Sequence, residues 1–109
     1  EHLSISHRRY STIVREQIRS HYQYRKWRIA VYLRDKRTCV VCGYNGRDIQ
    51  ADHIKKLAYL IEVNKITSLK KALKCKAIWD IRNGRTLCLD CHRETDNYGS
   101  NRQNTSIIN

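Results

Sequence analysis

The spacing of apolar residues in the first third of the chain predicts two consecutive helices. Residues 1–10 show no clear period, and we expect them to form a polar, basic arm that orders only on a partner. The first helix then follows Ser11, a residue type that caps helices well. Its apolar positions are Ile13, Val14 and Ile18.

The second helix is predicted to begin near His21, because Ser20 and Gln23 fit the S-x-x-Q pattern of a capping box. We expect it to end about Asp35. Its apolar residues form two stripes on opposite sides, namely Tyr24, Trp27 and Val31 on one and Tyr22, Ile29 and Leu33 on the other. Since a surface helix needs only one such stripe, this helix is predicted to be sandwiched, with the core of the domain on one side and either the first helix or a missing segment on the other.

The rest of the chain predicts short strands and short helices. Alternation over residues 49–54 predicts one strand, and residues 85–87 predict a second. A short helix is expected over residues 67–75, and a last helix over about residues 89–97. The inward positions of the first of these helices are Leu69, Ala72 and Leu73. These elements together predict a small α+β domain with N-terminal helices.

Composition indicates that this domain needs a stabilising cross-link. The chain has 109 residues and contains no Phe, Met or Pro, so its core must come from aliphatic residues, two Trp and seven Tyr. A single domain of this size gains little net stability from its core. We therefore expect a metal ion or disulfides to hold it.

An excess of basic residues gives the chain a net charge of +12. Residues 1–37 hold ten Lys or Arg against three acids, and residues 55–76 hold seven Lys against one Glu. Because each neutralised phosphate releases counterions, this charge favours nucleic acid as the partner. The alternative is that the charge serves only solubility. We expect no membrane partner, since that would call for a basic amphipathic helix with a broad apolar face.

Neither a membrane-spanning run nor a signal peptide can be recognised, and we expect an intracellular, cytoplasmic protein. The chain begins at Glu1 rather than at Met, so we expect a trimmed or processed piece of a longer polypeptide.

Four of the five cysteines form two CxxC pairs, Cys39 with Cys42 and Cys88 with Cys91. This spacing lets two thiolates from each pair reach one tetrahedral zinc ion, and the long gap between the pairs predicts an insertion. The alternative is disulfides in an exported protein. The fifth cysteine, Cys75, is predicted to be a partly buried thiol. A redox role fits poorly, because thioredoxin-like chemistry needs one CxxC in a βαβ setting.

A second group of residues could carry catalysis. Asp52 offers an oxygen ligand for a hard cation, and neutral His53 suits a general base. Adjacent strand residues point to opposite faces, so both can serve one site only if the strand ends or twists there. His92 directly follows the second CxxC pair, and Asp96 lies one helical turn further on. Each of these residues could also have a purely structural role. Asn83 with the glycine after it, for example, is first of all a signal for a tight turn.

The order of these motifs resembles that of the HNH endonucleases, particularly small phage-encoded ones with a zinc-stapled ββα-metal (His-Me finger) fold. The resemblance runs from about residue 24 to 98 and includes ADHI at 51–54, WDIRNGRTLC at 79–88 and CHRETDNYG at 91–99. The predicted organisation is a basic arm and first helix (1–20), a nuclease domain (21–99) and a polar tail (100–109). The resemblance also suggests a phage-encoded protein acting inside a bacterial host.

The resemblance implies that His53 is the general base and that Asn83 orients the loop carrying it. Asp52 and His92 would hold one divalent ion, with Asp96 as a further candidate ligand. Many relatives carry His at the position of Asp52, so Mg²⁺, Mn²⁺, Ni²⁺ and Zn²⁺ all stay open as the catalytic ion. The implied reaction is hydrolysis of DNA phosphodiester bonds, leaving 5′-phosphate and 3′-hydroxyl ends.

We expect double-stranded DNA to be bound with low sequence specificity, because no base-reading helix of a known type is recognisable. The candidate phosphate contacts are Arg82, Arg85, Arg93, Lys70, Lys71 and Lys74. The alternative function is a zinc-stapled nucleic-acid-binding module without catalysis. The target site, the number of strands cut and the oligomeric state stay open.

Overall fold

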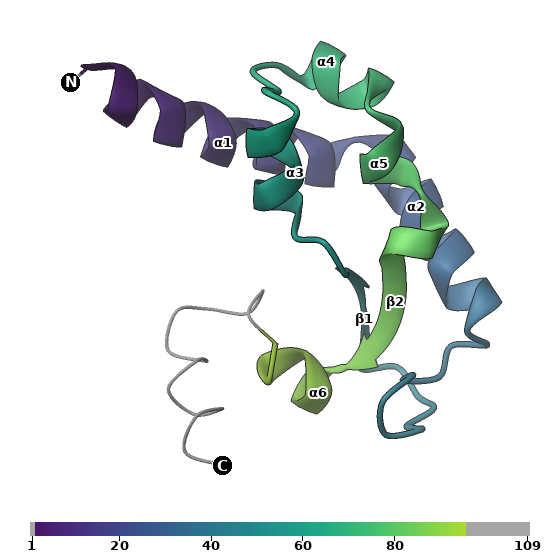
Figure 1. Cartoon of the computed structure of the whole chain (residues 1–109). Helices are drawn as coiled ribbons and strands as arrows, with labels where there is room; N and C mark the ends of the chain where they lie inside the picture. Colours follow the sequence, from purple (N-terminus) through teal and green to yellow (C-terminus); the bar gives the residue numbers. More distant parts are fainter. Residues whose placement is uncertain (1, 96–109) are drawn as a thin grey trace. The chain divides into compact units, whose positions relative to one another are not determined.

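The computed structural model describes residues 2–95, with side chains from residue 10 onward, and has the α+β composition predicted for the chain (Figure 1). Its elements in chain order are α1 (His2–Ser20), α2 (Tyr22–Arg34), β1 (Ile49–His53), α3 (Leu57–Val63), α4 (Leu69–Lys74), α5 (Lys76–Trp79), the 3-10 turn η1 (Ile81–Asn83), β2 (Gly84–Cys88) and α6 (Leu89–Arg93). In this part of the chain, no helix is both long and apolar enough to cross a membrane.

The chain divides into two compact units, which we call the helical unit and the sheet unit. The helical unit consists of the chain up to Trp27 together with residues 55–83. The sheet unit consists of residues 28–54 together with the chain from Gly84 onward. The boundaries predicted at residues 20 and 99 stay predictions.

The helical unit is built on a core of aliphatic side chains. α1 packs against α3 and α4, and it presents Val14 and Ile18, which lie one turn apart and are fully buried. The other buried members of this core are Leu57, Leu60, Ile61, Ile66, Ala72 and Ile78. Cys75 packs partly buried against the core, as predicted. Burying such side chains is the main stabilising term for a unit without Phe or Met.

The sheet unit contains two antiparallel strands, which lie side by side in Figure 1. The register places Ile49 opposite Cys88 and His53 opposite Gly84. β2 is buried along most of its length, and α6 contacts both strands. An isolated pair of five-residue strands is marginally stable, so this sheet depends on what is attached to its ends.

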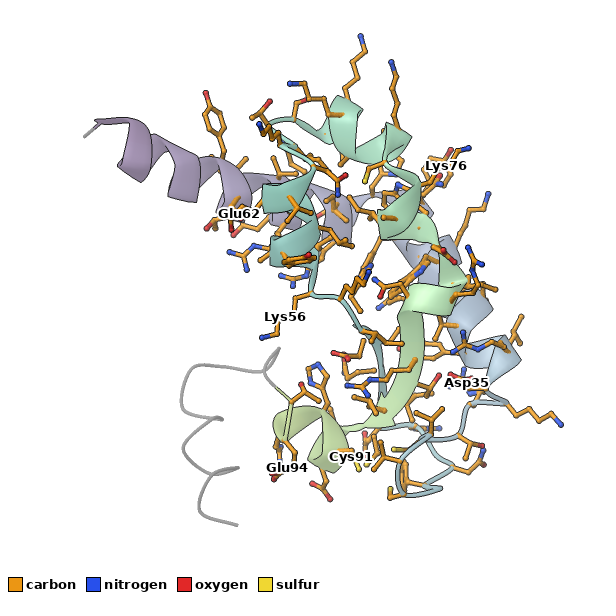
Figure 2. All side chains as sticks on the ribbon, viewed as in Figure 1. Asp35, Lys56, Glu62, Lys76, Cys91 and Glu94 are labelled. Carbon is orange, nitrogen blue, oxygen red and sulfur yellow. The ribbon has the colours of Figure 1, made fainter. Side chains whose placement is uncertain are left out.

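The end of α2 is attached to β2 by two charged side chains. Asp35, labelled in Figure 2, accepts a 2.9 Å hydrogen bond from the backbone N–H of Thr86. Arg34 donates to the Gly84 carbonyl at 2.7 Å and pairs with Asp35 at 2.8 Å. The hydrogen bond from Arg34 and those involving Thr86 hold the pKa of Asp35 below its usual value, although partial burial opposes this shift.

The structure differs from the prediction at the start of both N-terminal helices. α1 already begins at His2, so a polar arm followed by a helix start at Ser11 was wrong. The capping box was also wrong, because the Ser20 hydroxyl donates back to the Glu16 carbonyl at 2.9 Å. Instead, Nδ1 of His21 accepts the N–H of Gln23 at 3.0 Å and so caps α2.

Only one of the two apolar stripes predicted for α2 is covered. Trp27 and Val31 are buried and Tyr24 packs partly buried, which matches the first stripe. The residues of the second stripe are exposed by 66%, 47% and 68%, for Tyr22, Ile29 and Leu33 respectively. Within the described residues the first helix does not cover this stripe, so that part of the prediction is wrong, and cover by a missing segment stays a prediction.

The boundaries of the later elements need smaller corrections. Asn83 ends η1 and Gly84 begins β2, so the predicted tight turn at this pair is absent from the structure. α6 ends at Arg93, four residues before its predicted end. β1 and α4 lie within one or two residues of their predicted ranges.

We predict that Asp35→Ala destabilises the protein by about 2 kcal/mol, because it leaves the buried N–H of Thr86 without its acceptor. Asp35→Asn keeps an acceptor oxygen and should cost less. Because the pKa of Asp35 is lowered by folding, its stabilisation is present above its unfolded pKa and is lost as the pH falls through the folded value. Urea unfolding at neutral and acid pH measures both effects.

The exposed Asp48→Ala is the control for that series. An Asp35→Ala variant that unfolds at the same urea concentration as Asp48→Ala would contradict the attachment of α2 to β2 described above.

Candidate active site and cysteine cluster

The four predicted zinc ligands meet in the sheet unit. The ligand atoms of Cys39, Cys42, Cys88 and Cys91 all lie within 4.8 Å of one another, and in Figure 2 yellow sulfur atoms are drawn beside the labelled Cys91. The Sγ atoms of Cys42 and Cys88 are 3.6 Å apart. A tetrahedral zinc ion with Zn–S bonds of about 2.3 Å requires sulfur atoms about 3.8 Å apart, so the cluster fits zinc.

Backbone N–H groups donate hydrogen bonds to two of these sulfur atoms. Cys42 N–H donates to Cys39 Sγ at 3.5 Å, and Cys91 N–H donates to Cys88 Sγ at 3.4 Å. Burial acts to raise the pKa of Cys39, but hydrogen bonds to its sulfur outweigh burial and bring the pKa to about 6. Burial raises the pKa of Cys91. A bound cation favours the thiolate form of such cysteines.

Two backbone hydrogen bonds connect the cluster to the sheet. The N–H of Val40 donates to the carbonyl of Thr86 at 3.0 Å, which ties the first CxxC pair to β2. The N–H of Leu89 donates to the carbonyl of Asp48 at 3.0 Å, which ties the second pair to the start of β1. The cluster therefore joins both strands at the same end of the sheet.

Asp52 and His92 come together near the other end of β1. The Asp52 side chain is 1% exposed, and its Oδ1 lies 3.6 Å from Nε2 of His92. Its other oxygen, Oδ2, accepts from Nε of Arg85 at 3.1 Å. An oxygen and a nitrogen donor at this separation can both contact one ion at about 2.1 Å, so the pair fits a divalent metal.

His53 is the last residue of β1 and is buried. Because the strand ends there, the condition under which Asp52 and His53 could serve one site is met. The residue opposite His53 in the sheet is Gly84. The third metal candidate, Asp96, lies outside the described residues.

Asn83 binds the backbone two residues beyond His53. Its Oδ1 accepts the N–H of Lys55 at 2.8 Å, and its Nδ2 donates to the carbonyl of the same residue at 3.2 Å. The chain enters the helical unit at Lys55 and leaves it at Asn83. These two bonds therefore close the unit at the point where its ends meet.

Each of the three predicted phosphate-binding arginines has a carboxylate partner. Arg82 pairs with Asp80 at 3.0 Å, and Arg93 pairs with Asp90 at 3.6 Å. The third is Arg85, whose partner is the buried Asp52. The lysines predicted to contact DNA are exposed on α4, namely Lys70, Lys71 and Lys74.

The ion pair between Arg85 and Asp52 was not predicted. The signal for it lies in the register of the two strands, because antiparallel pairing of residues 49–54 with 85–87 can bring residues 52 and 85 face to face. The hydrogen bond of Asp35 to the backbone of β2 was not predicted either, and no local sequence motif indicates it.

Comparison with protein families identifies the family of this chain. A family model described as HNH endonuclease matches residues 39–98, which contain both CxxC pairs, the Asp-His pair, Asn83 and His92. The match covers more than half of the chain, and the chain belongs to the HNH endonuclease family. Comparisons with curated proteins and with solved structures gave no match.

We predict that the purified protein carries one zinc ion per chain and that Cys88→Ser removes it. Structural zinc contributes on the order of 10 kcal/mol to the folding of small domains, so the melting temperature of this variant should fall sharply. Metal analysis and thermal unfolding measure the two effects. Cys75→Ser is the matched control and should keep the zinc, whereas zinc-free parent protein would refute the assignment.

Proposed function

We propose that this HNH family member is a metal-dependent endonuclease that hydrolyses phosphodiester bonds of DNA. The observation that carries the proposal is the pair formed by the buried Asp52 and His92, which stand 3.6 Å apart next to the strand end that bears His53. A protein that only binds nucleic acid has no need for a buried carboxylate and an imidazole around one point.

Asp52 and His92 would hold the divalent ion. Such an ion, when bound, stabilises negative charge on the scissile phosphate and on the departing 3′ oxygen. The choice of one oxygen and one nitrogen donor suits several ions, and Mg²⁺, Mn²⁺, Ni²⁺ and Zn²⁺ are all candidates. Asp96 would add a second carboxylate.

His53 would act as the general base. A neutral imidazole can accept a proton from the attacking water. Hydrolysis with the 3′ oxygen as leaving group yields a 5′-phosphate and a 3′-hydroxyl. The attack needs the imidazole held in a fixed place, which is the work we assign to Asn83.

Asn83 is well suited to that work because it binds both backbone polar groups of one residue. Its two hydrogen bonds to Lys55 restrain the chain just after His53, as a neighbouring strand would do. An aspartate in its place could accept from the N–H but could not donate to the carbonyl. We therefore assign Asn83 a positioning role rather than contact with the substrate.

Duplex DNA is the partner that the charge of the chain favours. The lysines of α4 offer a row of exposed cations, and the net charge of +12 attracts a polyanion from a distance. Phosphate contacts position a duplex without reading its bases, so we infer low sequence specificity.

We predict that His53→Ala stops plasmid cleavage while duplex binding stays within about threefold of the parent, because a general base acts in the transition state. Cleavage and fluorescence anisotropy measure the two quantities on the same preparation, and zinc content checks that the variant is folded. The control is His7→Ala, which changes a histidine outside every motif. If His53→Ala cuts as fast as the parent, the role assigned to His53 is wrong. If the parent itself does not cut, the alternative function of a nucleic-acid-binding module without catalysis is favoured.

We predict that changing Lys70, Lys71 and Lys74 to Glu weakens binding to unrelated duplexes equally and flattens its salt dependence by roughly 0.9 in log–log slope for each lost contact. The matched control changes the same three lysines to Arg and should keep the slope of the parent. A salt titration by anisotropy measures it. An unchanged slope in the Glu variant would mean that α4 faces away from DNA.

A further inference from the structure

Arg85 binds one of the two carboxylate oxygens of Asp52, which is a proposed metal ligand. It stands directly opposite Asp52 in the antiparallel register, and its Nε donates to Oδ2 at 3.1 Å. The carboxylate is 1% exposed, and a buried carboxylate needs a cation or several donors to stay ionised. Arg85 supplies that cation from within the strand pair itself.

The opposite oxygen of the same carboxylate faces His92. Oδ1 lies 3.6 Å from Nε2 of His92, which is the edge of the carboxylate where the divalent ion is proposed to bind. A divalent ion there and the guanidinium of Arg85 would share one negative charge. Two cations on one buried carboxylate repel each other strongly, because little water lies between them to screen the charges.

We propose that Arg85 is a built-in competitor of the divalent ion for Asp52, and that a DNA phosphate relieves this competition by taking up the guanidinium. The inference rests on the proposed function, since it requires the ion to bind at Asp52 and His92. It makes Arg85 a coupling residue between the metal site and the substrate.

The side chain of Arg85 has the properties that such a role needs. Its side chain is 34% exposed, so part of it reaches solvent although its carboxylate partner is buried. A guanidinium also binds a phosphate through two parallel hydrogen bonds, which makes a backbone phosphate a fitting second partner. A lysine would offer only a point charge.

This competition predicts that metal and DNA strengthen each other's binding. By thermodynamic linkage, DNA must raise the affinity for metal by the same factor by which metal raises the affinity for DNA. An Arg85 that merely supports Asp52 as a ligand predicts the opposite sign for its removal, because the loss of an outer support weakens metal binding. The two roles are therefore separable by one titration.

The test measures Mn²⁺ binding by calorimetry on zinc-loaded protein in a His53→Ala background, which keeps both ligands while preventing cleavage of added duplex. We expect duplex to raise the affinity for Mn²⁺ about tenfold, a common size for such coupling. Adding Arg85→Gln, which keeps a donor near Asp52 but removes the charge, should raise the affinity without DNA by a similar factor and abolish most of the DNA effect. Arg85→Lys keeps the charge, so its Mn²⁺ affinity without DNA should stay near that of the parent, whereas the DNA effect should be smaller because lysine binds phosphate only as a point charge.

Arg82→Gln is the matched control, because it removes the same charge from the exposed pair with Asp80. It should leave the Mn²⁺ affinity unchanged. An Arg85→Gln protein that binds Mn²⁺ as the parent does, or more weakly, overturns the competition. Asp52→Asn distinguishes a failure of the proposed metal site from a failure of the competition by Arg85. If Asp52→Asn abolishes Mn²⁺ binding while Arg85→Gln changes nothing, only the inference on Arg85 fails. If Asp52→Asn leaves Mn²⁺ binding intact, the proposed metal site fails with it.

A measurement on the unaltered side chain covers the case in which Arg85→Gln does not fold. The Nε–H of Arg85, bonded to Asp52, should give an NMR signal protected from exchange with water. Saturating Mg²⁺ should move this signal and speed its exchange, as the bond to Asp52 breaks. An unchanged signal at saturation overturns the competition.

Discussion

Four sulfur atoms lie within 4.8 Å of one another in the sheet unit, and a zinc ion bound by them would hold this unit together. Two strands of five residues have too few contacts to be stable alone, and the buried apolar cluster around them consists of Leu87 and cysteines of the same cluster. The cluster joins β2 and the start of β1 through the backbone of its own CxxC pairs. A zinc ion bound by these sulfurs would fix the strand register, and with it the position of Asp52 opposite Arg85.

The two units use different means to solve the same problem of small size. The helical unit buries an aliphatic core between α1 and the helices of residues 55–83, whereas the sheet unit relies on sulfur atoms and on charged groups such as Asp35. Asn83 closes the helical unit on Lys55 at the residues through which the chain enters and leaves it. The hydrogen bonds of Asn83 restrain the helical unit at Lys55, and a metal-bound cysteine cluster would restrain the strand pair of the sheet unit.

The features of the fold and the site that could be predicted from the sequence are those whose residues have a fixed local spacing. CxxC pairs, the Asp-His pair and the run from Asn83 to His92 carry their chemistry in short segments, so the cysteine cluster and the HNH family could both be predicted. The wrong predictions have two causes, namely competition between local hydrogen bonds and contacts between residues far apart in the sequence. Ser20 looked like a helix cap but bonds back to Glu16, and the second stripe of α2 stayed exposed because nothing in the described residues covers it. The ion pair of Asp52 with Arg85 needed a strand register that no single segment specifies.

We propose that Asp52, His53 and His92 form a metal-dependent nuclease site, separate from the zinc site proposed at the four cysteines. It is tested most directly by incubating zinc-loaded protein with supercoiled plasmid, first without added metal after mild chelation and then with Mg²⁺, Mn²⁺, Ni²⁺ or Zn²⁺. The account predicts that the chelated protein keeps its cysteine-bound zinc and does not cut, and that at least one added ion converts the plasmid to nicked or linear DNA. Cleavage at full rate without any added ion, or no cleavage with every ion while the zinc remains bound, would contradict it.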